Sequence, residues 1–292
     1  MNRRRDEMLK EMGLWPVWRL RTATGAAAPV AAEATEPGQA SAETGSANHA
    51  SSVTHGLREE HPRPTSRRGA PVPPLDTHQS RPTSHASSIA GADERRTRIM
   101  QMDWGALKGC VAACVDCELH ARRTRTVFGV GDEVASWLFV GEGPGADEDA
   151  QGEPFVGQAG KLLDSMLAAI KLRRGKDVYI ANIVKCRPPG NRNPQPEEAL
   201  ACEPYLHRQI ELIEPKLIVA LGRVAALNLL ARDATIASLR GRVHEYRGTP
   251  LIVTYHPAYL LRNLPDKAKA WADLCFAVET MRGLKERAGA PI

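Results

Sequence analysis

Four short apolar runs constrain the fold of this chain more than any other feature of its sequence. The runs are WLFVG at 137–141, VYIANIV at 178–184, KLIVAL at 216–221 and PLIVTY at 250–255. Segments with the apolar spacing of helices follow them. Short apolar strands that alternate with helices are typical of a mainly parallel sheet covered by helices on both faces. We therefore predict an α/β fold in which ligands bind beyond the carboxyl ends of the strands.

The front third of the chain has a different composition. Its only aromatic residues are Trp15 and Trp18, and residues 22–100 are rich in Ala, Pro, Ser, Thr and His. Such a segment buries too little apolar area to offset its conformational entropy, so we expect a disordered linker there. Residues 1–21 have the pattern of a short amphipathic segment, which either binds a partner protein or has no specific partner. Residues 101–292 contain all six cysteines and are expected to form one folded domain.

The composition also excludes several classes of protein. No run of about 18 apolar residues is present, so we expect no membrane span. The start of the chain lacks the apolar centre of a signal peptide, and its acidic residues argue against a transit peptide. Reduced thiols in a bacterial cytoplasm are therefore expected. The net charge of +5 permits binding to nucleic acid without requiring it.

Four cysteines have spacing that suggests a metal site. Cys114 and Cys117 form a C-x2-C pair, Cys186 follows the second apolar run, and Cys202 lies in an expected helix. Four thiolates can bind zinc or a [4Fe–4S] cluster, and a zinc ribbon would usually show a second close pair. The spacing therefore favours iron–sulfur, while an ordinary buried role for the last two cysteines stays open.

A glycine-rich turn, GEGPGADED at 141–149, follows the first apolar run. It does not fit the G-x-G-x-x-G pattern, and the nearby GQAGKLL does not fit a phosphate-binding P-loop, so we expect no nucleoside-triphosphate enzyme. The turn permits close approach of a ligand to the backbone beside several carboxylates. These carboxylates also suit the start of a helix, where they would cap its free N–H groups.

The segment HPAYLLR at 256–262 follows the last apolar run. A histidine at a strand end can donate a hydrogen bond to a developing anion, although such a residue is more often structural. The apolar side chains after it can wedge between bases, and Arg262 can contact a phosphate. Phe155 lies in a glycine-rich stretch after the first turn, where it either fills the core or recognises a ligand.

Together these segments resemble the family 4 uracil-DNA glycosylases, the iron–sulfur branch of the uracil-DNA glycosylase superfamily. The matching pieces cover about residues 107–281 and are GEGPG with ED, GEPFVGQAGKLLD, VYIANIVKCRPPGNRNP, the cysteine spacing and HPAYLLR. The resemblance implies a three-layer α/β/α sandwich with a four-stranded, mainly parallel sheet. It also implies a [4Fe–4S] cluster on Cys114, Cys117, Cys186 and Cys202. The implied activity is base excision repair by a monofunctional glycosylase that removes uracil and leaves an abasic site.

The resemblance also implies roles for single residues. Phe155 would stack on the flipped uracil, Asn182 would read its Watson–Crick edge, and His256 would lie by its O2 atom. Leu260 or a neighbour would occupy the position of the intercalating loop. The better-known branch of the superfamily carries a water-activating Asp where this chain has Gly143, so the general base is open. Its candidates are Glu142, Glu148 and Asp149. We expect Glu142 to position the water or substrate and Glu148 to support it electrostatically, while Asn191 helps to hold the site.

The expected substrate is uracil-containing DNA, single- or double-stranded, bound by a monomer at the nucleoid. A non-enzymatic DNA-binding module with a structural four-cysteine metal site is the alternative.

Overall fold

The computed structural model describes residues 84–287 and residue 289. The amphipathic segment predicted for residues 1–21 and most of the predicted linker lie outside the described residues. No helix in the described part of the chain is long and apolar enough to cross a membrane.

A six-stranded sheet forms the middle layer of the domain, with the strand order β1-β3-β2-β4-β6-β5. The central strands β2 (Trp137–Gly141), β3 (Val178–Asn182), β4 (Leu217–Leu221) and β6 (Thr249–Thr254) are parallel. They coincide with the four apolar runs, so the four predicted parallel strands are confirmed, but the predicted count of four strands for the whole sheet is too low. The short strands β1 (Val130–Gly131) and β5 (His244–Tyr246) add an antiparallel partner at each edge, which the sequence did not predict.

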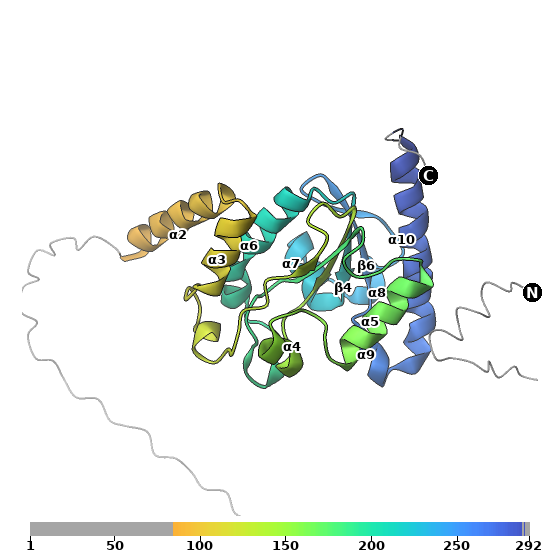
Figure 1. The fold of residues 1–292 in the computed structure, drawn as a ribbon, viewed down its shortest axis with the longest axis horizontal. Helices are drawn as coiled ribbons and strands as arrows, with labels where there is room; N and C mark the ends of the chain where they lie inside the picture. Colours follow the sequence, from red (N-terminus) through yellow and green to blue (C-terminus); the bar gives the residue numbers. More distant parts are fainter. Residues whose placement is uncertain (1–83, 288, 290–292) are drawn as a thin grey trace, which may run out of the picture. The chain divides into compact units, whose positions relative to one another are not determined.

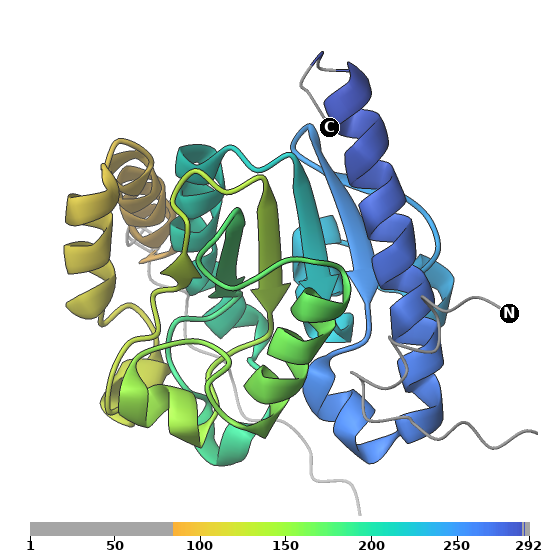
Figure 2. The ribbon, with the colours of Figure 1, turned by 45° about the vertical axis from the view of Figure 1, so that its right-hand side comes forward.

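Helices cover both faces of this sheet because its strands are apolar on both sides. Along β2, Leu138 and Val140 pack with α3 (Trp104–Ala112), α6 (Pro196–Ile213) and α7 (Arg223–Leu230) in one core cluster. Trp137 and Phe139 point to the other face and pack with α5 (Gln158–Ala169) and α10 (Lys267–Arg287). Figures 1 and 2 show these helix layers on either side of the strands. The predicted three-layer α/β/α sandwich is confirmed.

The linker prediction for residues 22–100 is wrong at its C-terminal end, where residues 84–100 form helix α2 (Ser84–Met100). Its Ile99 is 0% exposed and belongs to the core cluster of α3 and α6. Arg95 lies 2.8 Å from a carboxylate oxygen of Asp116. The Ala- and Arg-rich composition of α2 gives little sign of a helix in the sequence. The helix folds because the domain supplies an apolar partner surface and acidic partners.

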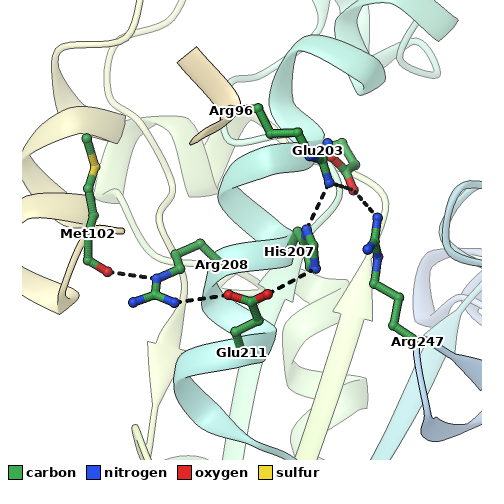
Figure 3. Close-up of polar contacts among 7 residues, drawn as sticks. All are labelled: Arg96, Met102, Glu203, His207, Arg208, Glu211 and Arg247. Carbon is green, nitrogen blue, oxygen red and sulfur yellow. Dashed lines mark hydrogen bonds and ion pairs between the residues drawn. The ribbon is translucent and has the colours of Figure 1, made fainter. Parts of the chain in front are cut away.

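Polar contacts attach α2 to α6 and to the turn between β5 and β6 (Figure 3). Arg96 forms an ion pair with Glu203 and donates to Nδ1 of His207 over 2.9 Å. Glu203 also faces Arg247 at 3.9 Å, and Arg208 donates to the Met102 carbonyl at 2.7 Å. The folded domain therefore begins before residue 101.

The carboxyl ends of the parallel strands lie together at one end of the sheet. In Figure 2 their arrowheads point toward the end where α4 (Ala146–Gln151) and α9 (Pro257–Arg262) lie. The first of the parallel strands, β2, has β3 on one side and β4 on the other, so the chain reverses its direction of winding there. Ligands in open α/β sheets bind at such a switch point.

Candidate active site

A cavity of about 400 Å³ opens at this end of the sheet. The loops that follow β2, β3 and β6 supply its walls. Among the residues predicted for the substrate or DNA site, the cavity is lined by Glu142, Gly143, Glu148, Phe155, Asn182, Asn191, His256 and Arg262. The fold therefore brings together residues that are up to 120 positions apart in the chain.

Asn182 is the last residue of β3, and its side chain is buried in this cavity wall. It is 2% exposed, and its Oδ1 atom has no hydrogen-bond partner. A buried polar atom without a partner costs about 1–3 kcal/mol. A Cβ atom on Gly141, its neighbour in β2, would lie 2.4 Å from this oxygen, so glycine is needed there. The orphaned oxygen indicates that a ligand donor completes the site.

His256 follows β6 and caps the first turn of α9. Its Nδ1 atom accepts a hydrogen bond from the Ala258 N–H at 3.1 Å, so Nδ1 carries no proton. Burial, together with the nearby charge of Arg262, lowers the pKa of His256 to about 4, against an opposing effect of Glu148. The imidazole is therefore neutral at pH 7 with its proton on Nε2. That N–H has no acceptor among the described side chains and is available to a ligand.

Phe155 lies against His256 on the cavity wall. The two ring centroids are 5.5 Å apart at an interplanar angle of 32°. Phe155 is 6% exposed and has a positive φ of 56°. The same wall thus offers an aromatic face and a neutral hydrogen-bond donor.

The acidic residues of the glycine-rich turn have different surroundings. Burial raises the pKa of Glu142, whose carboxylate has no hydrogen-bond partner in the described part of the chain. Glu148 instead accepts bonds from the backbone N–H groups of Gly145, Val156 and Gly157 at 3.1, 2.9 and 3.1 Å. Asp149 accepts from the backbone of residues 124 and 125. Glu142 is thus available to a ligand, whereas the other two hold loops.

The four predicted metal ligands line one small pocket on the other side of the sheet end. Cys114 and Cys117 follow α3, Cys186 follows β3, and Cys202 lies in α6, and none of them forms a disulfide. Arg123 donates to the sulfur of Cys186 at 3.2 Å. Within the described residues, no three His, Cys, Asp or Glu side chains are placed to hold a single metal ion. The pocket is therefore lined by four thiol groups that surround the same cavity.

Comparison with known proteins assigns the chain to a family. The family model of the uracil DNA glycosylase superfamily matches residues 128–275. The chain belongs to this superfamily.

Its similarity is strongest to the type-4 branch. The type-4 uracil-DNA glycosylase of Archaeoglobus fulgidus is 52% identical over 159 residues, which is 52% of this chain and 79% of the relative. That of Thermotoga maritima is 48% identical over 54% of this chain and 83% of its own length. That of Pyrobaculum aerophilum is 43% identical over 59% of this chain and 92% of its own length. The resemblance seen in the sequence motifs is therefore confirmed, and the chain is a type-4 member of the superfamily.

One site residue of this uracil-DNA glycosylase family member needs correction. The intercalating position was predicted for Leu260 or a neighbour, and Leu260 itself is 0% exposed and packs with Met166 and Leu274 in the core. It cannot reach DNA from there. Its neighbour Leu261 is 42% exposed. Residues 257–262 form a helix, so adjacent side chains point in different directions, and the exposed apolar group is one position further on.

The sequence analysis of this superfamily member did not predict Arg192 in the loop after β3 or its partner Glu198 in α6, which lie beside the predicted Asn191. Arg192 lines the cavity and donates to both carboxylate oxygens of Glu198 at 2.8 and 2.6 Å. Glu198 also accepts from the Gln195 N–H at the start of α6. Asn191, with a positive φ of 56°, accepts from Arg187 Nε at 2.7 Å. The sequence signal was a Gln-Pro-Glu-Glu helix start, which predicts a capping carboxylate three residues after the cap.

Proposed function

We propose that this chain is a monofunctional uracil-DNA glycosylase, which removes uracil from DNA and leaves an abasic site for base excision repair. The observation that carries this proposal is the buried Asn182 Oδ1 atom without a partner, in a cavity shared with a neutral His256. The Asn182 amide can accept from uracil N3–H and donate to O4. Cytosine presents the reverse pattern, so a bound cytosine would leave the polar groups of the site unpaired. A site of this kind rejects the wrong base strongly.

His256 would stabilise the leaving group. When the N1–C1′ bond breaks, its electron pair goes to uracil, and negative charge develops on O2 while the sugar becomes oxocarbenium-like. A donor aimed at such a developing charge contributes a few kcal/mol. The Nε2–H of a neutral imidazole is suited to this role because it donates a hydrogen bond without transferring its proton.

Glu142 would position the water that adds to C1′, because its carboxylate faces the cavity without another partner. Glu148 would support the reaction indirectly by holding the backbone of residues 145 and 156–157. Phe155 would stack on the flipped base, and Gly143 and Asn191 would shape the pocket around it.

Arg262 and Leu261 would contact the DNA outside the base pocket. Both are exposed at the end of α9, with Arg262 on the cavity rim. An exposed apolar side chain can fill the gap left in the base stack, and an arginine can pair with a phosphate. Flipping a base costs a few kcal/mol, and least at a mispair, so G·U pairs and single strands should be good substrates. We propose that the protein acts as a monomer on nucleoid DNA.

We further propose that Cys114, Cys117, Cys186 and Cys202 hold a [4Fe–4S] cluster. Four thiols from three segments around one pocket fit the ligand set of such a cluster. The Arg123 side chain and the Lys185 backbone N–H donate to the sulfurs of Cys186 and Cys202 at 3.2 and 3.3 Å, as donors around thiolate ligands do. The cluster would tie the segment after α3 to the loop after β3 and to α6.

Purified full-length protein tests the catalytic proposal. Incubated with oligonucleotides that contain uracil in a single strand or in a G·U pair, it should leave alkali-sensitive abasic sites, with no strand cleavage of its own. Matched oligonucleotides with cytosine or thymine should stay intact. Tight binding of the uracil strand without base release would instead support a non-enzymatic DNA-binding module.

Iron and sulfide analysis tests the cluster proposal. The wild-type protein should be brown with about four irons per chain, and Cys186→Ala should lose most of that iron. Cys275→Ala, in α10 and outside the cysteine pocket, is the matched control and should keep it. Colourless wild-type protein with bound zinc would contradict the proposal.

A further inference from the structure

The backbone of Phe155 has a conformation that needs support. Its φ of 56° lies in the left-handed region, which non-glycine residues with large side chains rarely adopt. Residues held in this region persist when the surrounding structure forces them, and they cluster at ligand sites. Here the conformation turns the Phe155 ring onto the cavity wall beside His256.

Arg174 supplies that support from outside the cavity. It lies in the loop between α5 and β3, and its two terminal nitrogens donate to the carbonyls of Pro154 and Phe155 at 2.7 and 2.8 Å. An ion pair with Asp164 of α5 at 3.0 Å fixes the orientation of the guanidinium. The planar fork of arginine can bind two carbonyls and a carboxylate in a fixed geometry, which the compact ammonium on the flexible lysine stem does not reproduce.

The first turn of α5 closes the other side of this backbone. A Cβ atom on Gly160 would lie 1.8 Å from the Phe155 carbonyl oxygen, so only glycine allows α5 to approach so closely. The Phe155 carbonyl is therefore enclosed between Gly160 and the Arg174 guanidinium. Without Arg174, the two carbonyls would lose their donors, and the backbone could relax away from the positive φ.

We infer that Arg174 is a positioning residue for base excision, which holds the Phe155 ring in place against the flipped base through the carbonyls of residues 154 and 155. Arg174 is not among the residues that line the cavity, so it acts through Phe155 rather than on the substrate. This inference rests on the proposed glycosylase activity. It also explains why a loop that precedes β3 matters to a site built after β2, β3 and β6.

A double-mutant cycle tests the inference in the full-length, cluster-loaded protein. Single-turnover uracil release is measured for the wild type, Arg174→Met, Phe155→Ala and the double variant. Arg174→Met should slow release by about 10- to 100-fold, the range caused by misplacement of a substrate-positioning group. In the Phe155→Ala background the same substitution should change the rate by less than about twofold, because residues that act as one unit are non-additive.

Two further variants control for charge and folding. Arg173→Met removes the neighbouring, exposed arginine of the same loop and should leave the rate unchanged. Arg174→Lys keeps the charge and loses the fixed planar fork, so its rate should lie between those of the wild type and Arg174→Met. It also serves as the test variant if Arg174→Met does not fold, as judged from its melting temperature and visible absorption.

If Arg174→Met slows uracil release equally in the wild-type and the Phe155→Ala background, the positioning role of Arg174 is overturned and the glycosylase proposal stays intact. An Arg174→Lys rate equal to that of the wild type would have the same consequence. A wild-type protein that releases no uracil would overturn the proposed function, and this inference with it. The two failures are therefore distinguished by the wild-type measurement alone.

Discussion

Asn182 has surroundings that suit a ligand better than they suit the unliganded fold. Its side chain makes no hydrogen bond within the described residues, and its Oδ1 atom is buried. The backbone around it is well supported, since its carbonyl accepts from the buried Lys185 Nζ at 3.0 Å. A side chain that weakens the fold while it faces a cavity is best explained by a role in binding.

Asn182→Ala should therefore separate activity from stability. We expect uracil release to fall by about 100-fold or more, because a site donor and acceptor are lost together. The melting temperature should stay the same or rise, because the unpaired buried oxygen is removed. Asn228→Ala, at an exposed asparagine of α7, is the matched control and should change neither quantity. A fully active Asn182→Ala variant would contradict the assignment.

The neutral state of His256 leads to a prediction about pH and stability. The histidine of the unfolded chain binds a proton near pH 6.5, whereas the folded site does so only near pH 4. Between these values the unfolded state holds more protons, so the free energy of unfolding should decrease as the pH falls from about 6.5 to 4.

Denaturant unfolding of the wild type and of His256→Gln, at several pH values from 7.5 to 4.5, measures this contribution. The decrease should be smaller in the variant, because glutamine does not titrate. Other groups titrate in both proteins, so the difference between the two curves isolates His256. Identical curves would mean that the folded histidine has an ordinary pKa.

The strand-end residues could be predicted from sequence, and the groups that hold them could not. Asn182 lies within one apolar run and His256 directly follows another, each in a local motif. Arg174 binds backbone carbonyls about 20 positions away. Every residue has a backbone carbonyl, so the pattern of side chains does not predict this contact. Leu260 was the wrong residue for the intercalating position, because its segment forms a helix that turns this side chain toward the core.

At the scale of elements, α9 combines a core contact and an exposed contact in adjacent positions. Leu260 packs with α5 and α10, while Leu261 is exposed beside the cavity residues of the same helix. The two leucines thus form a matched pair with opposite expected effects.

Leu260→Ala should lower the free energy of unfolding by about 2–5 kcal/mol, as for other buried leucines. Leu261→Ala should leave it unchanged and should slow uracil release from duplex DNA more than from single strands, because only the duplex leaves a gap in the base stack. Denaturant unfolding and single-turnover assays on both substrates measure these effects. Equal slowing on both substrates by Leu261→Ala would argue against a wedge.

The predictability of the elements follows from the length and burial of each one. The parallel strands are five or six residues of almost continuous apolar sequence. Such runs can be recognised as strands from a single sequence. Strand β1 has two residues and β5 three, both only partly buried, so they give no periodic signal. Helix α2 was missed because its sequence is weakly apolar and its stability comes from contacts with α6.

At the scale of the whole molecule, the family match and the core locate the catalytic unit. The match spans residues 128–275, and the described fold extends it toward the N-terminus through α3 and α2. In the described part of the chain, the linings of the cavity and of the cysteine pocket come from positions between 111 and 262.

Two truncations test where this unit begins. A chain of residues 84–292 should release uracil at close to the full-length rate. A chain of residues 101–292 should be less stable, because it loses the buried Ile99 and the ion pairs of Arg95 with Asp116 and of Arg96 with Glu203. Melting temperatures and single-turnover rates of both chains measure this. Equal stability of the two would restore a boundary at residue 100.

The two short antiparallel strands have a consequence for how this protein behaves at high concentration. Each outer parallel strand is partly covered, because β1 pairs with Tyr179 and Ile180 of β3, and β5 pairs with residues 249–251 of β6. The outermost strands of the described sheet are two and three residues long. Short edges of this kind give a second molecule too little backbone to add a strand to, so the sheet is protected against edge-to-edge aggregation.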